Sequence, residues 1–219
     1  MRVIVRVYKF YGKKYGLDAL SKRRLKISTL DDLNDPFEFR GFKLSSKEAR
    51  NAWERTRSEL FSDKGLICFC KDWSNPVIWS HYAECHRGIA LGFDIPAAKV
   101  LEVKYRKTRL PFPELSKMPA SKLVGLMQSS LATKFKHWEY ENEVRVFISA
   151  DETCPETGLF FADFDDTFKL REIVIGPLSD ITSEEIRENS DIGSAKIITS
   201  RLAFRDYRVA IQRRFDLQK

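Results

Sequence analysis

The segment HWEYENEVRVFI, residues 137–148, carries a charged side chain at every second position. Read as a β-strand, it places Glu139, Glu141, Glu143 and Arg145 on one face, because successive side chains of a strand point to opposite faces. Two carboxylates two residues apart on one face lie roughly 6.5–7 Å apart. Such a pair can divide the work of a glycosyl reaction, with one bonding a sugar hydroxyl and the other positioning a nucleophile.

Two interpretations of this acidic row are open. Periodicity alone favours the solvated face of a half-buried strand, since antiparallel sheets commonly turn one face to water. Like-charge crowding opposes that interpretation, because Glu139, Glu141 and Glu143 repel one another and Arg145 is the cation that extends the row. Arg145 is expected to hold the second carboxylate in place or to neutralise the pair. We therefore expect the row to be a site.

A second candidate is NPVIWSHYAECHRG, residues 75–88, which we expect to form a helix over 75–85. Trp79 and Tyr82 are three residues apart and so share a helical surface. His81 and His86 are five apart, a poor spacing for two metal ligands on one helical face, and no metal site is expected here. The aromatic residues around His81 are either core or a stacking wall for a nicotinamide or a base.

Further motifs limit the chemistry. In LNDPFEF, Asn34 and Asp35 most often serve the turn itself, although Pro36 could hold them rigidly enough to orient a ligand or an arginine. The chain has no GxxxxGK[ST], GxGxxG or GxSxG motif, which argues against P-loop, Rossmann and α/β-hydrolase chemistry. The cysteines show no paired CxxC spacing, so we expect reduced, mostly buried thiols at Cys68, Cys70, Cys85 and Cys154.

The elements that would position these residues are mostly strands. Hydrophobic patterning and turn residues predict strands at 3–8, 24–28, 65–70, 88–95, 100–105, 137–148, 158–161, 170–175, 195–199 and 207–213. Helices are expected at 17–21, 45–61, 75–85, 120–136 and 183–188. Because the helices fall in the connections without strict βαβ alternation, we expect an α+β fold with a curved mixed, mostly antiparallel sheet. We expect residues 1–219 to form a single domain, with 107–119 as a loop that covers a site or meets a partner.

Composition and charge leave several partners open. No apolar run approaches the ~20 residues of a membrane span, and the N-terminus has no signal-peptide pattern, so we expect a cytoplasmic protein without a membrane partner. The net charge is +7, and residues 1–26 hold nine Lys and Arg against one acid. This basic segment favours phosphate-bearing ligands or only solubility. One alternative is therefore a nucleic-acid-binding protein or nuclease with His81 or His86 as general base; another is a non-catalytic interaction module.

Three stretches taken together resemble a known bacterial family. They are VYKF with LNDPFEF, ICFC with WSHYAECHRGIALGF, and KHWEYENEVRVF, followed more thinly by EIVIGP. In this order the NDPFE, WSHYA and WxxExEVR elements resemble a widespread family known as a domain of unknown function. The resemblance runs from about Tyr8 to Arg145 and implies no activity by itself.

The order of motifs also resembles, more distantly, the mono-ADP-ribosyltransferases. Those enzymes have a basic residue in the first strand, a second strand motif before a helix, and an ExE motif on a late strand. Glu141-Asn142-Glu143 matches the ExE motif. The resemblance implies a split sheet and NAD as substrate. Glu143 would bond the ribose 2′-hydroxyl and stabilise the oxocarbenium-like transition state, and Glu141 would orient the acceptor.

The same resemblance implies a cofactor site and a biological setting. NAD would be held by residues of the first strand, the aromatic helix and the ExE strand: Tyr8, Lys9, Trp79, His81, Tyr82 and Arg145. The chain would be a defence or toxin effector that modifies a protein or nucleic-acid acceptor and meets an inhibitor or antitoxin. Two departures indicate an altered substrate or lost activity: Lys9 stands where the family uses Arg or His, and Cys68-Phe69-Cys70 replaces a Ser-Thr-Ser motif.

Overall fold

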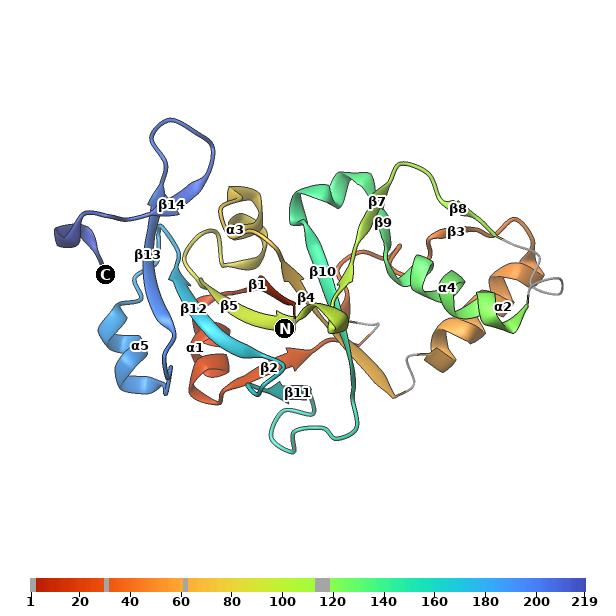
Figure 1. Ribbon diagram of the computed structural model, residues 1–219, viewed down its shortest axis with the longest axis horizontal. Coiled ribbons are helices and arrows are strands. Elements are labelled where there is room, and N and C mark those ends of the chain that lie inside the picture. The colour runs from red at the N-terminus through yellow and green to blue at the C-terminus, as the bar shows by residue number, and fades with distance from the viewer. Residues whose placement is uncertain (1–2, 30–31, 61–62, 113–118) are drawn as a thin grey trace.

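The computed structural model describes residues 3–29, 32–60, 63–112 and 119–219, and an eight-stranded mixed sheet lies at its centre (Figure 1). β12 and β13 are parallel, and the other neighbouring pairs for which a register is defined are antiparallel. Across the sheet, the strands follow the order β14 (Val209–Ile211), β13 (Lys196–Leu202), β12 (Lys169–Ile175), β5 (Ile89–Pro96), β1 (Ile4–Tyr11), β4 (Lys64–Cys70), β10 (Glu143–Ser149) and β6 (Leu101–Glu102).

The helices and three two-stranded ribbons lie in the connections between these strands. The α+β prediction with a curved mixed sheet is confirmed. The helices are α1 (Lys13–Ser21), α2 (Lys47–Leu60), α3 (Pro76–Tyr82), α4 (Ala120–Leu131) and α5 (Ser183–Asn189), with 3-10 turns η2 (Ala97–Lys99), η4 (Lys136–Glu141) and η5 (Phe215–Leu217). The ribbons pair β2 (Arg24–Ile27) with β11 (Phe160–Asp163), β3 (Phe42–Lys43) with β8 (Leu110–Pro111), and β7 (Lys104–Arg106) with β9 (Thr133–Phe135).

Strand alternation sorts the sheet residues into two cores. On β1, Val7 packs in the larger core with residues of α1, α5, β2 and β11, whereas Tyr8 packs in the smaller core with α3 and β14. On β4, Phe69 and Cys70 divide between the two cores in the same way. β10 follows the same rule, since its Val144 lies in the larger core and Glu143 faces the side of α3. The larger face is thus apolar, and the other carries polar groups.

Two predicted elements near residue 140 are wrong. The expected helix over 120–136 ends at Leu131, and β9 follows it. The expected strand over 137–148 begins only at Glu143, because the preceding residues form the 3-10 helix η4. Asn142 then adopts a left-handed conformation, with φ of 45°, that turns the chain into β10. The four charged side chains therefore do not form one strand face. The expected strand over 100–105 is likewise divided, into β6 and β7.

A left-handed turn follows α3, and the HRG motif (residues 86–88) and the IGP motif (residues 175–177) pack around it. The expected helix over 75–85 ends at Tyr82, and residues 84–86 have positive φ values of 49°, 49° and 72°. Two glycines allow other backbone to approach this turn. A Cβ on Gly88 would lie 1.8 Å from the carbonyl oxygen of Tyr11, and one on Gly176 would lie 2.3 Å from that of His86. These two motif positions therefore serve the fold.

The segments around α2 and α4 lie at one end of the molecule (Figure 1). In Figure 1, α2 and α4 lie together at one end of the ribbon, far from β13, β14 and α5. An aromatic cluster packs there, with the Phe42 ring 5.0 Å from Trp53 and 5.6 Å from Phe112.

Residues 113–118 of the expected loop lie outside the described residues. Within the described chain, no helix has both the length and the apolar character needed to cross a membrane.

Candidate functional site

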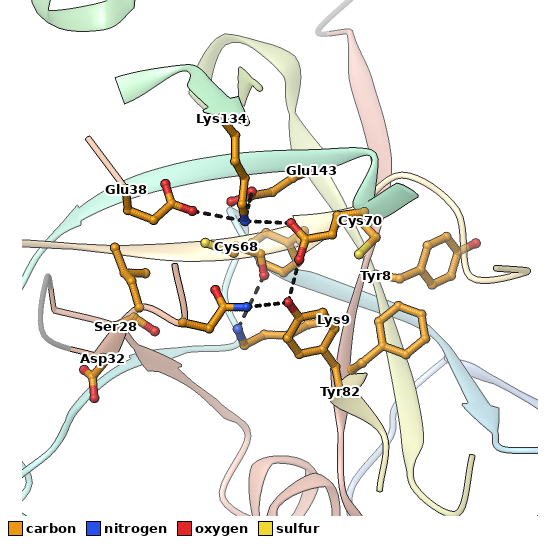
Figure 2. Close-up of a pocket in the computed structure, with 15 residues that line it drawn as sticks. Tyr8, Lys9, Ser28, Asp32, Glu38, Cys68, Cys70, Tyr82, Lys134 and Glu143 are labelled. Carbon is orange, nitrogen blue, oxygen red and sulfur yellow. Dashed lines mark hydrogen bonds and ion pairs between the residues drawn. The ribbon is translucent and has the colours of Figure 1, made fainter. Parts of the chain in front are cut away.

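Three carboxylates converge on the ammonium group of Lys134. Its Nζ lies 3.0 Å from Glu38 Oε1, 2.7 Å from Glu141 Oε2 and 3.1 Å from Glu143 Oε2. The four side chains are all 5% exposed or less. Figure 2 shows Lys134 descending between the carboxylates, with its nitrogen at their meeting point. Because these charges are buried, each carboxylate depends on this shared cation.

A second buried cation, Arg145, fixes Glu143 from the strand itself. Its Nε donates to Glu143 Oε1 at 2.7 Å and its Nη2 to Glu143 Oε2 at 3.1 Å. Nη2 also donates to Glu38 Oε2 at 2.7 Å, and Nη1 to the carbonyl oxygen of Leu131 at 2.9 Å. The planar guanidinium thus binds Glu143 with two parallel bonds and leaves that carboxylate little freedom to turn.

Sheet register and the left-handed residue explain how these groups meet. Glu143 pairs with Cys70 on β4, so both side chains point to the α3 side of the sheet. Asn142 reverses the chain direction just before β10 and thereby returns Glu141 to the same cation as Glu143. The Glu143 amide donates to the hydroxyl of Tyr105 on β7 at 2.7 Å, which attaches the β7–β9 ribbon to the start of β10.

Glu141 is linked to the turn that follows β2 through a tyrosine. The Tyr82 hydroxyl at the end of α3 donates to Glu141 Oε1 at 2.5 Å and accepts a bond from Asn34 Nδ2 at 2.7 Å. Asp35 closes the turn, since its carboxylate accepts the amide of Phe37 at 2.9 Å. LNDPFEF therefore uses its Asp for the turn, whereas its Asn joins this relay and its last Glu, Glu38, joins the ion cluster.

A pocket of about 190 Å³ opens beside these groups (Figure 2). The pocket lies where β1 and β4 separate. The two strands pair at Tyr8 and Cys70. Beyond this pair, the Lys9 ammonium donates to the carbonyl oxygen of Cys68 at 3.4 Å. The polar lining of the pocket comes from β1, β4, the segment after β2, α3, β9, η4 and β10: Tyr8, Lys9, Ser28, Asp32, Asn34, Glu38, Cys68, Cys70, Tyr82, Lys134, Glu141 and Glu143.

The pKa values of the two carboxylates of the ExE motif are shifted in opposite directions. Burial alone raises the pKa of Glu143, but the charges of Arg145 and Lys134 outweigh burial and lower that pKa to about 2. Burial also raises the pKa of Glu141, and here Lys134 and Tyr82 oppose the rise without cancelling it, so its pKa stays above the ordinary value. Glu143 is thus firmly ionised, whereas Glu141 is the one placed to exchange a proton.

The basic and thiol groups of the pocket differ from one another as well. Burial lowers the pKa of Lys9, whereas the three carboxylates outweigh the same effect at Lys134 and raise its pKa. Burial raises the pKa of Cys68 and of Cys70, so both thiols stay protonated at neutral pH. Lys134 is therefore a fixed structural charge, and Lys9 is a cation whose charge depends on what enters the pocket.

The structure brings most of the predicted residues to this pocket. Glu141, Glu143, Tyr8, Lys9 and Tyr82 all line it. Arg145, predicted as a cofactor ligand, instead lies fully buried behind Glu143 and supports it. The ring of Tyr8 lines the pocket, but its hydroxyl points away and donates to Glu172 Oε2 at 2.8 Å (Figure 2).

Three other predicted positions lie elsewhere. Trp79 is 0% exposed in the smaller core, with its ring against Phe10 at 4.9 Å, so it has no face toward a ligand. His81 is exposed and stacks on Tyr140 with ring centres 6.0 Å apart. Glu139 is exposed and pairs with Lys136. Packing against Phe10 buries Trp79 in the smaller core, and His81 and Glu139 lie on exposed faces of α3 and of the 3-10 helix η4.

Two residues of the cluster were not predicted, Glu38 and Lys134. Glu38 is far from Glu143 in sequence, and Lys134, nine residues before Glu143, fell inside an expected helix that in fact ends at Leu131. A signal did exist in the charge balance. A buried row of carboxylates needs more cations than Arg145 alone, and Lys134 is the nearest basic residue before η4.

The described part of the chain gives no support to two other kinds of site. No group of three or more His, Cys, Asp or Glu side chains there is arranged to hold a metal ion. The basic residues after α1 are paired or stacked: Lys22 lies 2.9 Å from Asp18, Arg23 lies 3.7 Å from Asp191, and Arg24 covers the Phe161 ring at 3.7 Å. That patch is therefore largely neutralised by its own neighbours.

No protein-family model matches this chain, and neither a search of curated proteins nor one of solved structures found a match. The resemblances drawn from the motifs stay predictions.

Proposed function

We propose that the pocket binds NAD and cleaves its nicotinamide–ribose bond, with transfer of ADP-ribose to an acceptor or to water. One observation carries this proposal. Glu143, ionised with a pKa of about 2, lies on the pocket wall beside Glu141, whose pKa is raised. Two neighbouring carboxylates with pKa values pushed apart are the arrangement by which glycosidases divide ionic and proton-transfer roles.

Glu143 would act on the ribose. As the bond from C1′ to the nicotinamide nitrogen breaks, its electron pair leaves with nicotinamide and positive charge develops on the sugar. A preorganised carboxylate stabilises that charge without having to reorganise. Arg145 and Lys134 occupy three of the roughly four acceptor positions of Glu143. The Cys68 thiol is a further, weak donor to it, and a ribose hydroxyl would replace that thiol.

Glu141 would act on the acceptor. An attacking hydroxyl or water forms the new bond to C1′ and must give up a proton, and a carboxylate with a raised pKa is the better base for it. Tyr82 and Lys134 hold Glu141 in position. A volume of about 190 Å³ is below the ≈ 300–1,000 Å³ of common ligand pockets, so it would enclose the nicotinamide ribose with the adjoining phosphate beside Lys9 and leave the adenosine outside.

The test is nicotinamide release from NAD by the full chain, followed by chromatography. Glu143→Gln should lower the rate at least about 100-fold, the scale of losing one electrostatic contact to a transition state. Glu139→Gln is the matched control, because Glu139 is exposed, lies four residues earlier and pairs its carboxylate with the neighbouring Lys136. Absence of release by the wild-type chain, or equal rates in the two variants, would remove the proposal.

A further inference from the structure

A second pocket, of about 280 Å³, lies against the β7–β9 ribbon. Five basic residues and two aromatic rings dominate its lining: Arg40, Arg106, Lys107, Arg109, Lys134, Phe37 and Phe135. The described residues that line it include no acidic side chain. Its composition is therefore opposite to that of the first pocket, where carboxylates predominate.

The ribbon separates the two pockets. Tyr105 pairs with Lys134, and both side chains face the Glu143 cluster. Arg106 pairs with Phe135 one residue later, and both line the second pocket. Strand alternation accounts for this division, since neighbouring residues of a strand point to opposite sides. Lys134 contributes to the walls of both pockets, so the two sites share one element.

Three cations of the second pocket have no carboxylate partner among the described residues. Arg40 lies 3.1 Å from Glu54, whereas among the described residues no carboxylate lies within ion-pair distance of Arg106, Lys107 or Arg109. The Arg109 guanidinium covers the Phe37 ring at 5.2 Å instead. A concave surface with several unpaired cations attracts an anion, and guanidinium groups bind phosphate through two parallel bonds.

The aromatic rings add a second requirement for the ligand. Phe37 is 59% exposed and Phe135 is 46% exposed. Arg109 lies over the Phe37 ring and His137 stacks on the Phe135 ring with ring centres 4.6 Å apart, so both rings already make stacking contacts with flat side chains. Bases stack readily on such rings. From the unpaired cations and the exposed rings together, we propose that this second pocket binds the phosphate and base of a nucleotide.

Two sources of such a nucleotide share this chemistry. It is either the adenosine phosphate half of NAD, reaching over the ribbon, or a separate nucleotide that serves as acceptor. In both cases the inference deepens the proposed function, since it names what lies beside the reacting pocket. The pocket itself can be tested without turnover, because binding of a simple nucleotide needs no glycosidic cleavage.

The experiment is calorimetric titration of the full chain with AMP and with adenosine, which lacks the phosphate. The variant is Arg106→Gln with Arg109→Gln. The control is Arg55→Gln with Lys122→Gln, which removes the same charge from exposed positions of α2 and α4 that line neither pocket. We expect AMP binding to weaken at least about 10-fold in the variant, the size of a charge-assisted hydrogen bond, and less than about 2-fold in the control.

Adenosine separates phosphate binding from stacking. Its affinity should change less than about 2-fold in the arginine variant, because it offers the guanidinium groups no phosphate. The inference is overturned if AMP at millimolar concentration fails to bind, if AMP and adenosine bind equally, or if variant and control weaken AMP alike. A raised KM for NAD in the variant would assign the pocket to the dinucleotide, and an unchanged KM with weakened AMP would assign it to a second nucleotide. If the protein releases no nicotinamide but binds AMP as expected, the proposed function is refuted and the nucleotide-binding inference is not.

Discussion

Glu141 and Glu143 contact one ammonium group, that of Lys134, at 2.7 and 3.1 Å, although a left-handed residue stands between them in the chain. Of these two carboxylates, that of Glu143 also binds Arg145, and that of Glu141 does not. That asymmetry accounts for the opposite pKa shifts, because one carboxylate is paired with two cations and the other with one cation and a phenol. The shifts have measurable consequences for stability, and the individual contacts have consequences for activity.

Acid should destabilise the fold through Glu143. Its pKa is about 2 in the folded chain and about 4.3 in an unfolded one, so the unfolded chain binds the proton first as the pH falls. The contribution of Glu143 is complete above about pH 4.5 and decreases as the pH falls toward 2. We expect a loss of about 2 kcal/mol between about pH 5 and pH 2.5. Urea unfolding across that range measures it, with Glu143→Gln as the variant in which this loss must disappear; an identical loss there would refute the assignment.

Glu141 should produce the opposite trend at higher pH. Its folded pKa is raised, so the folded chain binds this proton more readily than the unfolded chain does. Stability should therefore increase as the pH falls through the raised pKa toward about 4.3, the unfolded value. Glu141→Gln should flatten this part of the profile. The measurement is the same urea series continued to pH 8, and a profile of unchanged slope in the variant would contradict the raised pKa.

Tyr82→Phe should move the pH profile of activity. The lost hydroxyl donates to Glu141 and stabilises its charged form, so the pKa of Glu141 should rise further. If Glu141 acts as a base, the acidic limb of the rate profile must shift to higher pH. Tyr140→Phe is the matched control, because among the described residues the Tyr140 hydroxyl makes no hydrogen bond. Equal profiles for both variants would separate Tyr82 from proton transfer.

Much of the fold and part of the site could be predicted from the sequence. Apolar residues in short runs identified β4 and β5, and crowding of like charges identified Glu141 and Glu143 as a site candidate. Periodicity could not reveal that Asn142 takes a left-handed conformation, with φ of 45°, since tertiary contacts decide it. The row was therefore assigned to one strand, although Glu141 and Glu143 reach Lys134 from different elements.

Long-range partners explain the remaining errors. Lys134 and Glu38 meet only because the β7–β9 ribbon and the turn after β2 approach β10, and no local pattern encodes that approach. Trp79 had the spacing of a ligand-stacking residue, but the same spacing describes a core residue, and packing against Phe10 determined the outcome. Motifs indicated candidate residues and left open which of them face the pocket.

Arg145→Lys should destabilise the protein strongly. Lysine keeps the charge but lacks the planar fork that binds Glu143 twice and also reaches Glu38 and Leu131. We expect a loss of about 3 kcal/mol in the free energy of unfolding, the scale of a broken buried ion pair. Arg171→Lys is the comparison: its guanidinium binds Asp94 at 2.9 Å while about a third of the side chain is exposed.

The comparison separates geometry from charge. Arg171→Lys should cost less than about 1 kcal/mol, because an exposed ion pair contributes little. Thermal and urea unfolding of both variants provide the measurement. If the two substitutions cost the same, the guanidinium geometry at Arg145 does not hold the cluster, and charge alone accounts for its stability.

Lys9 should make NAD binding depend on protonation. Its ammonium lines the pocket, its hydrogen bond to Cys68 O is long at 3.4 Å, and burial lowers its pKa. A pyrophosphate bound beside it would restore the charged form, so binding must be accompanied by proton uptake and strengthen as the pH falls through that pKa. Titration calorimetry in buffers of different ionisation enthalpy measures the uptake directly. Lys9→Gln should abolish it and weaken NAD binding about 10-fold, the loss of one charged hydrogen bond. Lys14→Gln, at an exposed position of α1, should change neither quantity, and proton uptake that persists in Lys9→Gln would assign the phosphate contact to another residue.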